Sequence, residues 1–526
     1  MKDNTVRIDE TATPSRLVFS DVFNAAIPFI DRHLEEGRGD KTAIRTVEGE
    51  TSYRALAEQV ARTGNALLGA GIGRGDRVLM VVKDCPEFVF CFFGAVKAGI
   101  VPVPVNTMMR PQDYRFLIED SGCRGIVYSE EWAEAVEGGL DAVDEKPPVI
   151  LRVDGAGGLR EKAASASADL TPARTTAMDD CFWLYSSGST GNPKGVVHHH
   201  RDMVCTSERY GRTIAGLRED DSVFSVSKLF HSYGFGNAMT FPLWVGATIG
   251  LSDRRPTPQM TFEAIEALRP TVFFGVPTMY AQQLHAMEEA SPDLSSIRIC
   301  ISAGEALPGD VMLRWKEKTG TLILDGLGST EMLHIFVSNT EDDWKAGSSG
   351  RPVPGYAVRL VDEDAADVPE GEMGTLLVRG ESAAKLYWNN PEKTAATMLG
   401  DDWLDTGDMY YRDEDGYFIN CGRGDDMIKV GGLWCSPFEI EARLIEHPKV
   451  LEAAVVGRPD DDGLIKPEAN IVLNNAADAG AALEDELKAH CREALARYKY
   501  PRWFNFVDTL PKTVTGKIQR FRLREG

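Results

Sequence analysis

The sequence predicts an α/β protein with a large N-terminal domain of stacked βα sheets and a small α+β C-terminal domain. Helical and strand-like segments alternate between residues 19 and 151, which favours mostly parallel sheets. A short, polar, glycine-rich stretch at 422–426 separates this part of the chain from residues 427–526, which follow a pattern of their own. With 526 residues, 43% of them hydrophobic, the chain is long enough to bury a substantial core.

Hydrophobic spacing predicts the elements of the N-terminal domain. Residues 55–70 carry apolar side chains three and four positions apart, as on one face of a helix. Glycines at 71–76 then turn the chain into a strand at 78–82. Residues 161–180, rich in Ala, Ser and Thr, are expected to form an exposed connector. Further strands are predicted at 181–184, 223–226, 248–251 and 272–275, and a further helix at 260–268.

The most apolar window, residues 88–105, does not predict a membrane span. It contains Lys97, Pro102 and Pro104, so we expect a buried helix followed by a strand. The first residues also lack the apolar stretch of a signal peptide.

The C-terminal residues form a second pattern. Helices are expected near 437–445 and 483–495, and strands near 453–456 and 468–473. These elements suffice for a small α+β domain. We therefore expect two domains, residues 1–424 and 425–526.

Charge and cysteine usage exclude several classes of function. The net charge of −23 repels nucleic acid and anionic membranes, so neither is an expected partner. The nine cysteines are scattered and include no C-x-x-C pair, which argues against a disulfide framework or a zinc site. These features favour a soluble protein of the reducing cytoplasm.

The stretch YSSGSTGNPKG at 185–195 predicts a loop that holds phosphate. Its glycines let the backbone approach, its N–H groups and hydroxyls donate hydrogen bonds, and Lys194 supplies positive charge. It differs from the P-loop of kinases because only two residues separate Gly188 from Gly191, and Gly195 follows the lysine. Taken alone, the stretch is also compatible with a flexible linker.

Five more stretches make the prediction specific. DGLGSTE at 325–331, TGD at 406–408, GRGDDMI at 422–428, KVGG at 429–432 and PKTVTGK at 511–517 follow in order. In this order the chain resembles the adenylate-forming superfamily, which includes acyl- and aryl-CoA synthetases, carrier-loading adenylation domains and beetle luciferases. The resemblance spans residues 19–524 and implies ATP and Mg²⁺, with CoA as co-substrate.

The resemblance assigns roles in adenylation. Lys517 matches the C-terminal catalytic lysine, which bridges the substrate carboxylate and the α-phosphate. Glu331 and Thr190 would hold the metal, and Glu331 counts with Lys517 among the catalytic residues. Asp408 would bind both ribose hydroxyls, with Arg423 beside it. The implied ATP-binding residues are Ser186, Ser187, Gly188, Ser189, Thr190, Gly191, Lys194, Gly304, Glu305, Ala306, Asp325, Gly326, Leu327, Gly328, Ser329, Thr330, Asp408 and Arg423.

The same resemblance assigns the second step to a mobile C-terminal domain. In relatives, the segment that holds Lys429, Gly431 and Gly432 swings into the site and lines the pantetheine tunnel. Asp425 matches the hinge position, where neighbouring glycine eases a large backbone rotation. Acetylation of the residue that matches Lys517 switches off bacterial relatives, which implies an acetyltransferase and a deacetylase as partners.

The acid-binding segment resembles that of the benzoate–CoA ligase branch. After Glu331 the chain reads MLHIF, and the resemblance implies an aryl pocket made by Tyr233, Ala303, Gly304, Gly328, His334 and Ile335, with Ser232 at the ring edge. His334 is also compatible with a core histidine whose hydrogen bonds are satisfied. Plain benzoate enzymes typically read FFAYGLG where this chain has His231 and Ser232, so unsubstituted benzoate is in doubt. The triplet at 198–200 is interpreted as the start of a helix instead of a metal site.

The sequence therefore predicts an ATP-dependent aryl-acid:CoA ligase. Benzoate or a substituted benzoate, ATP and CoA would give aryl-CoA, AMP and diphosphate through aryl-AMP. The alternative is an adenylation protein that loads an aryl acid onto a carrier protein. No aspartate stands at 231–233 to hold an amino acid's ammonium group, and no carrier domain follows Lys517 in this sequence. A luciferase-like oxygenase and a silent nucleotide sensor are disfavoured. The ring substituents and a homodimeric state are left open.

Overall fold

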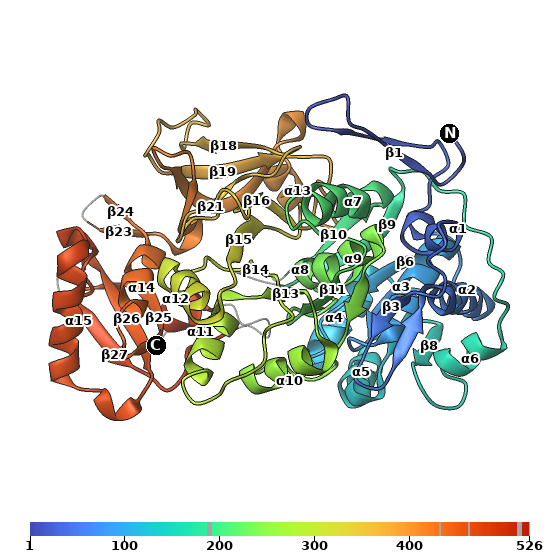
Figure 1. Cartoon of the computed structure of the whole chain (residues 1–526), viewed down its shortest axis with the longest axis horizontal. Helices are drawn as coiled ribbons and strands as arrows, with labels where there is room; N and C mark the ends of the chain where they lie inside the picture. The colour runs from blue at the N-terminus through green and yellow to red at the C-terminus, as the bar shows by residue number, and fades with distance from the viewer. Residues whose placement is uncertain (187–191, 431–432, 461–462, 513–517, 525–526) are drawn as a thin grey trace.

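The computed structural model of the chain describes residues 1–186, 192–430, 433–460, 463–512 and 518–524 (Figure 1). Its largest sheet has nine strands in the order β17-β16-β15-β14-β13-β11-β12-β3-β4. The inner strands run parallel, and antiparallel pairs close both edges. The strands are β3 (Thr42–Arg45), β4 (Glu50–Ser52), β11 (Ser222–Ser225), β12 (Thr248–Gly250), β13 (Val272–Gly275), β14 (Ile299–Ser302), β15 (Ile323–Gly328), β16 (Ile335–Ser338) and β17 (Arg351–Pro352).

A second, four-stranded sheet in the order β6-β5-β7-β8 is parallel throughout. Together the two sheets confirm the predicted α/β class. The strands are β5 (Arg77–Val81), β6 (Val101–Pro104), β7 (Gly125–Tyr128) and β8 (Val149–Arg152). The helices of this half are α2 (Tyr53–Gly69), α3 (Pro86–Ala98), α4 (Pro111–Ser121), α5 (Ala133–Ala142) and α6 (Leu159–Ser165).

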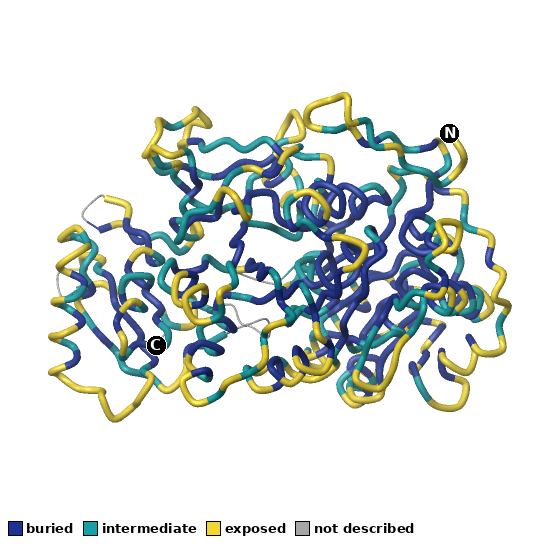
Figure 2. Tube along the Cα trace, viewed as in Figure 1, coloured by how far each residue is buried: buried dark blue, intermediate teal, exposed yellow. Residues whose placement is uncertain are grey.

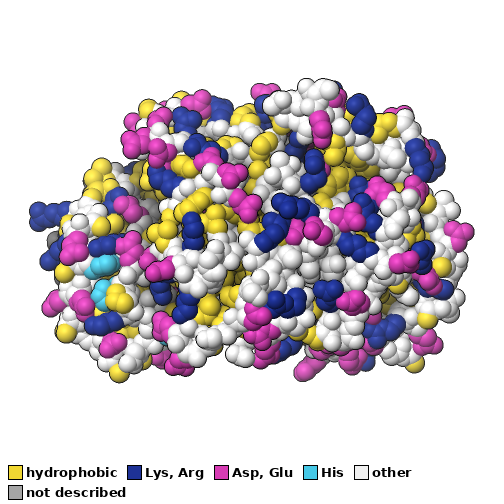
Figure 3. Space-filling view, in the orientation of Figure 1, with side chains coloured by type: hydrophobic (Ala, Val, Ile, Leu, Met, Phe, Trp, Pro, Cys, Tyr) yellow, Lys and Arg dark blue, Asp and Glu magenta, His cyan; other side chains and the backbone are white. Residues whose placement is uncertain are grey.

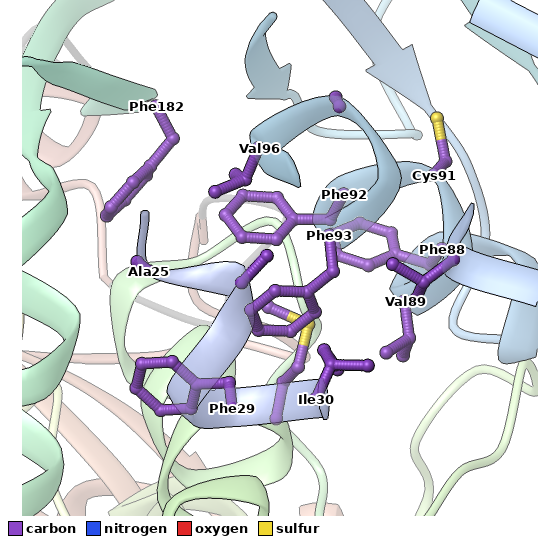
Figure 4. Close-up of a cluster of buried hydrophobic side chains, with 14 of the residues drawn as sticks. Ala25, Phe29, Ile30, Phe88, Val89, Cys91, Phe92, Phe93, Val96 and Phe182 are labelled. Atoms are coloured by element: carbon purple, nitrogen blue, oxygen red, sulfur yellow. The ribbon is translucent and has the colours of Figure 1, made fainter. Parts of the chain in front are cut away.

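Helices α2 and α3 pack tightly between these sheets and form the main core. A Cβ at Gly64 would lie 2.7 Å from the Gly94 carbonyl oxygen, so glycine is needed where the two backbones meet. Ser52 caps α2, since its hydroxyl accepts a hydrogen bond from the Ala55 amide. Figure 4 shows aromatic rings pointing toward one another in this core, and Phe92 and Phe93 lie 5.2 Å apart edge to face. Each buried phenylalanine contributes roughly 1.5–3 kcal/mol through burial.

The predicted elements of this half are found within a few residues, with one correction. The window at 88–105 is α3 followed by β6, as expected. Residues 161–180 were expected to form an exposed connector, and this was wrong in part. The segment begins inside α6. Leu170 is buried because it packs in the main core cluster, and Thr175 is buried where its hydroxyl donates a hydrogen bond to the Phe23 carbonyl oxygen.

Two further sheets of the N-terminal region were not predicted as such. One is three-stranded, with β10 (Lys194–His199) paired antiparallel to both β9 (Asp180–Ser186) and β20 (Leu386–Tyr387). The other is an antiparallel sheet of β18 (Ala357–Val361), β19 (Gly374–Arg379), β21 (Leu404–Arg412) and β22 (Phe418–Arg423). It forms a separate layer at the top of Figure 1.

The C-terminal region is a small α+β unit with its own core. It contains the hairpin β23 (Ile428–Val430) and β24 (Leu433–Cys435), the sheet β25 (Val450–Pro459), β26 (Ile465–Leu473) and β27 (Trp503–Phe506), and the helices α14 (Pro437–Ile445), α15 (Ala481–Ala494) and α16 (Arg520–Arg524). The unit lies beside α11 (Pro277–Ala286) and α12 (Gly309–Thr319), as Figure 1 shows. Gln282 donates a hydrogen bond of 3.4 Å to Glu452 across this boundary.

Burial is greatest at the centre of the N-terminal region, and exposed segments lie at the periphery (Figure 2). Acidic and basic side chains are interspersed on the face shown in Figure 3. Among the described residues, no helix combines the length and apolar character needed to cross a membrane.

Candidate active site

The stretch predicted to bind phosphate, 185–195, includes the end of β9 and the start of β10, which form a hairpin. Ser186 ends β9 and pairs in register with Lys194, the first residue of β10. The Lys194 ammonium lies 5.3 Å from the centre of the Tyr387 ring, a cation–π contact. Burial lowers the pKa of Lys194, with Lys393 acting in the same direction and Glu331 opposing it. Between the strands, Ser187, Gly188, Ser189, Thr190 and Gly191 lie outside the described residues.

Glu331 is fixed from two sides by neighbours that the sequence did not reveal. The Tyr387 hydroxyl donates a 2.7 Å hydrogen bond to Glu331 Oε1, and the Ala384 amide donates one of 2.7 Å to the Glu331 carbonyl oxygen. Burial and the neighbouring carboxylate raise the pKa of Tyr387, so this hydroxyl stays a donor. Tyr387 therefore touches both Lys194 and Glu331 and links the two predicted phosphate-site residues.

Of the predicted ATP-binding residues, 304–306 follow β14, and 325–328 belong to β15. Gly304 has a φ of +95°, which favours glycine, and Ala306 follows in the same turn. Glu305 accepts a hydrogen bond of 3.1 Å from the Thr278 hydroxyl. Asp325 is 2% exposed, and burial raises its pKa well above the ordinary value, opposed by Ser302. Among the residues that the structure describes, none hydrogen-bonds to its Oδ1, so a buried acceptor or acid proton is available there.

The remainder of this motif continues along β15 toward Glu331. Gly326, Leu327 and Gly328 complete the strand, and Ser329 accepts a hydrogen bond of 3.1 Å from the Met332 amide. The Thr330 hydroxyl lies 3.5 Å from that of Ser232. The structure thus brings the predicted acid-binding residue Ser232 next to the ATP motif.

The predicted ribose-binding pair is formed between neighbouring strands. Asp408 on β21 pairs in register with Arg423 on β22, and their side chains are 3.1 Å apart. Arg423 also donates to the Thr406 carbonyl oxygen at 2.9 Å. Asp408 is the main cause of the raised pKa of Arg423. Gly407 has a φ of +69°, and a Cβ there would lie 2.9 Å from Arg423, so glycine keeps the pair together.

The predicted aryl-pocket residues come together around His334. Tyr233 lies on α8 (Ser232–Phe235), and its carbonyl oxygen is 3.2 Å from His334 Nε2. Gly328 pairs with Ile335, and a Cβ at Gly328 would lie 2.7 Å from the His334 carbonyl oxygen. Ala303, which is 2% exposed, belongs to the same hydrophobic cluster as Ile335.

His334 is neutral in this environment. It packs 4.4 Å from the Phe241 ring, with Tyr210 and Tyr233 within 5.4 Å, so burial lowers its pKa to about 3. Nε2 faces a carbonyl oxygen and must donate, which leaves Nδ1 as an acceptor. No residue in the described part of the chain bonds to that buried atom. Tyr210 and Phe241 were not predicted, because no motif marks them.

In the segment expected at CoA, Lys429 is exposed. Lys429 lies on β23, 4.9 Å from the ring centre of Trp434 on β24, while Gly431 and Gly432 lie outside the described residues. The expected hinge residue Asp425 is exposed in a short 3₁₀ turn, Gly424–Asp426.

Lys517 also lies outside the described residues, and residues on both sides of its segment bind carboxylates of the C-terminal unit. Lys512 binds Glu452, the acceptor for Gln282 of α11. Burial opposes the raised pKa of Arg520, which is caused mainly by Glu441 at 2.7 Å, while Glu305 of the N-terminal region contributes least.

The donor chemistry near Glu331 suits Mg²⁺. Glu331 offers one carboxylate oxygen beyond the one that Tyr387 occupies, and Thr330 offers a hydroxyl. In the part of the chain that the structure describes, no group of three or more His, Cys, Asp or Glu side chains could hold a metal. Mg²⁺ bound through one or two protein oxygens, with phosphates and water as the other ligands, fits this arrangement.

A cavity of about 700 Å³ lies outside this site. Its walls include His199, Arg201, Tyr356, Arg379 and Trp403, and none of the predicted site residues lines it.

The β9–β10 hairpin predicted to bind phosphate, the Asp408–Arg423 pair predicted to bind ribose and the small C-terminal unit agree with a nucleotide-binding α/β enzyme. Residues 30–388 match the AMP-binding enzyme family, and residues 439–517 match the C-terminal domain of AMP-binding enzymes. The chain belongs to this family.

The individual relatives are similar over nearly their full length. The chain is 48% identical to a benzoate–CoA ligase of Thauera aromatica, over 98% of this chain and 99% of the relative. It is 45% identical to a 4-hydroxybenzoate–CoA/benzoate–CoA ligase of Rhodopseudomonas palustris, over 96% and 94%. The crystal structure of the anthranilate CoA ligase AuaEII with anthranoyl-AMP covers 96% of this chain and 98% of its own, with 41% identity and a TM-score of 0.92.

Proposed function

We propose that this protein is an AMP-forming ligase that joins an aromatic carboxylic acid to CoA, with ATP and Mg²⁺. The observation that carries the proposal is the continuity of β15 and its turn. Gly328 lies against His334 in the predicted aryl pocket, and Glu331, three residues later, lies near Lys194 and Tyr387. The carboxylate of an acid in this pocket is thereby directed toward the phosphates of ATP.

In the first step, a carboxylate oxygen of the acid attacks the α-phosphorus of ATP. A P–O bond to the acid forms, the bond to the β-phosphate oxygen breaks, and diphosphate leaves. Lys194 neutralises the departing phosphates, and Lys517 bridges the carboxylate and the α-phosphate. Mg²⁺, held by Glu331 and Thr190, would neutralise phosphate charge. Asp408 and Arg423 would hold the ribose, Gly304, Glu305 and Ala306 would contact the adenine, and Asp325 would belong to the ATP-binding motif.

In the second step, the CoA sulfur attacks the acyl carbon and AMP leaves. The thiol proton is released, and the product is an aryl thioester. We propose that the chain divides at residues 424 and 425 and that rotation at Asp425 brings Lys429, Gly431 and Gly432 to the site. The exposed position of Lys429 and the absence of side chains at both glycines support this role.

The substrate class is supported by the relatives, whose names specify benzoate, 4-hydroxybenzoate and anthranilate. Tyr233, Ala303, Gly328, His334 and Ile335 would form a flat slot for the ring. Ser232 and the free Nδ1 of His334 offer polar contacts for a hydroxyl or amino substituent.

A panel experiment tests the function. Release of AMP and diphosphate should depend on an aryl acid and on CoA, measured across benzoate, three hydroxybenzoates, 2-aminobenzoate and an alicyclic acid. Aryl-AMP formation without CoA, followed by transfer to a carrier protein, would favour the carrier-loading alternative. No pyrophosphate release with any acid would contradict both.

Three finer proposals accompany the function. Acetylation of Lys517 would remove the charge that the first step needs and switch the enzyme off. A homodimer is proposed as the oligomeric state, to be tested by sedimentation. A cytoplasmic location agrees with nine cysteines that are all free.

A further inference from the structure

His198 lies four residues after Lys194 on β10 and is completely buried. Alternate residues of a strand face the same side, so Lys194 and His198 share one face of the sheet. The register pairs His198 with Phe182 of β9, and their rings stack at 5.2 Å with an angle of 16°. This packing holds the plane of the imidazole.

Both ring nitrogens of His198 have oxygen partners. Nδ1 lies 3.0 Å from Asp202 Oδ2 on α7 (His200–Thr206), and Nε2 lies 2.9 Å from the Thr330 carbonyl oxygen. A carbonyl oxygen can only accept, so Nε2 donates to Thr330. Burial would raise the pKa of Asp202, but hydrogen bonds from His198 and His199 hold it below the ordinary value, so this carboxylate is charged. Asp202 therefore fixes the direction in which Nε2 points.

The Thr330 carbonyl belongs to the peptide that connects Thr330 with Glu331. The same oxygen accepts a hydrogen bond of 3.0 Å from the Leu333 amide, which closes a turn around Glu331. Leu333 has a φ of +67°, uncommon for a leucine, so this turn needs outside support. On the other side, Ala384 and Tyr387 hold the Glu331 carbonyl and carboxylate.

We propose that His198 is a positioning residue for the Mg²⁺–ATP site. Through the Thr330 peptide it sets where Glu331 stands relative to Lys194, and Asp202 orients it. The inference rests on the proposed function, because it needs Glu331 at the metal. The path is continuous: Lys194 and His198 share one strand, and His198 bonds to the residue that precedes Glu331.

A buried histidine can also serve folding alone, and the chain contains one for comparison. His33 is fully buried, and its Nε2 lies 2.7 Å from the Leu243 carbonyl oxygen. It belongs to the core near α2, where it packs 4.3 Å from the Tyr53 ring. His33→Gln is therefore a matched control for the loss of a buried imidazole bonded to a carbonyl.

Two isosteric variants separate the hydrogen bond to Thr330 from packing. The amide nitrogen of Gln stands where Nε2 stands in histidine, so His198→Gln keeps a donor for Thr330 and loses Asp202. The shorter His198→Asn places its amide near the Nδ1 position, so it keeps a group for Asp202 and loses Thr330. Each variant buries one side-chain amide. The thermal unfolding of both variants is compared with that of His33→Gln to show whether they are equally stable.

The main readout is Mn²⁺ binding, followed by electron paramagnetic resonance in the presence of α,β-methylene-ATP. His198→Asn should weaken Mn²⁺ binding by roughly 10- to 100-fold, the usual effect of removing a group that orients a metal ligand. The Mn²⁺ affinity of His198→Gln should stay within about threefold of the wild-type affinity. This margin allows for the dependence of a single interaction on its surroundings. His33→Gln should bind as the wild-type protein does. As a kinetic readout, the Mg²⁺ concentration at half-maximal adenylation should rise in His198→Asn without a change in KM for the acid.

Unchanged Mn²⁺ binding in folded His198→Asn would overturn the inference. Equal weakening in His198→Asn and His198→Gln would overturn it too, because packing instead of the Thr330 bond would then be responsible. If the wild-type protein and analogue bound no Mn²⁺, the proposed function itself would fail, and the inference with it.

Discussion

Glu331 and the β23–β24 hairpin differ in how the structure holds them, although both are predicted to act on one acyl group. Glu331 is bonded through its carboxylate to Tyr387 and through its backbone to Ala384. On the hairpin, Leu433 is 54% and Trp434 is 40% exposed, so two large apolar side chains face solvent. We therefore propose that Glu331 is positioned for adenylation in advance, whereas the hairpin must be carried to the site for thioester formation.

The largest expected effects test this division directly. Lys517→Ala should slow adenylation by roughly 10²- to 10³-fold, the scale for the loss of one preorganised electrostatic contact. It should largely spare CoA attack on supplied aryl-AMP. Gly432→Leu should do the reverse, because a side chain would fill the pantetheine tunnel. The measurement is the single-turnover rate of each step. Equal slowing of both steps in both variants would contradict the assignment of the two steps to different segments.

The second prediction concerns Tyr387. Tyr387→Phe keeps the ring beside Lys194 but removes the hydrogen bond to the Glu331 carboxylate, which is worth about 1.5–3 kcal/mol for a charged acceptor. We expect adenylation to fall by roughly tenfold to a hundredfold, with thioester formation from aryl-AMP unchanged.

Tyr417→Phe is the matched control for this change. Tyr417 also donates to a carboxylate, that of Asp343, which is exposed and is not one of the predicted site residues. Tyr417→Phe should leave the rates of adenylation and of thioester formation unchanged. Similar losses in the two variants would mean that Tyr387 supports folding only.

The third prediction concerns the acid pocket. If Ser232 bonds a ring substituent, Ser232→Ala should shift selectivity toward benzoate and away from hydroxy or amino analogues by about 1–3 kcal/mol. His334→Ala should admit bulkier rings with little change in KM for ATP. Values of kcat/KM for benzoate and three hydroxybenzoates are the measurement. An unchanged acid profile in both variants would show that the pocket is misplaced and would leave the ligase function standing.

The sequence predicted the parallel core well because periodicity and glycine-rich turns are local signals. The limits of α14 and of β13 were predicted to the residue. The layer of β18, β19, β21 and β22 was missed because its antiparallel strands carry no comparable local pattern. Motifs identified Glu331, Asp408 and Arg423, but not Tyr387, which lies 56 residues from its acceptor. Such a contact depends on β20 pairing with β10, which local spacing does not encode.

The last and smallest predicted effect extends the comparison to stability. Burial lowers the pKa of His33 and His334 to about 3, and that of His200 to about 4, and all three lie in the N-terminal region. Unfolding would return each pKa to about 6.5, so the unfolded chain binds more protons and stability falls as pH drops below 6.5. Each histidine contributes at most about 1.4 kcal/mol per pH unit.

The raised pKa of Asp325 makes the folded chain less stable as pH rises above 3.8, which opposes the effect of the histidines. The difference between variants is therefore more informative than the total dependence of stability on pH. Urea unfolding at pH 7 and pH 5.5 should show a smaller loss of stability in His33→Gln than in the wild-type protein. The C-terminal His490 is only partly buried, and its pKa is lowered by that burial, so His490→Gln should change the slope less. If His490→Gln reduced the loss of stability between pH 7 and pH 5.5 more than His33→Gln did, the comparison would be reversed. The acid sensitivity would then arise in the C-terminal unit.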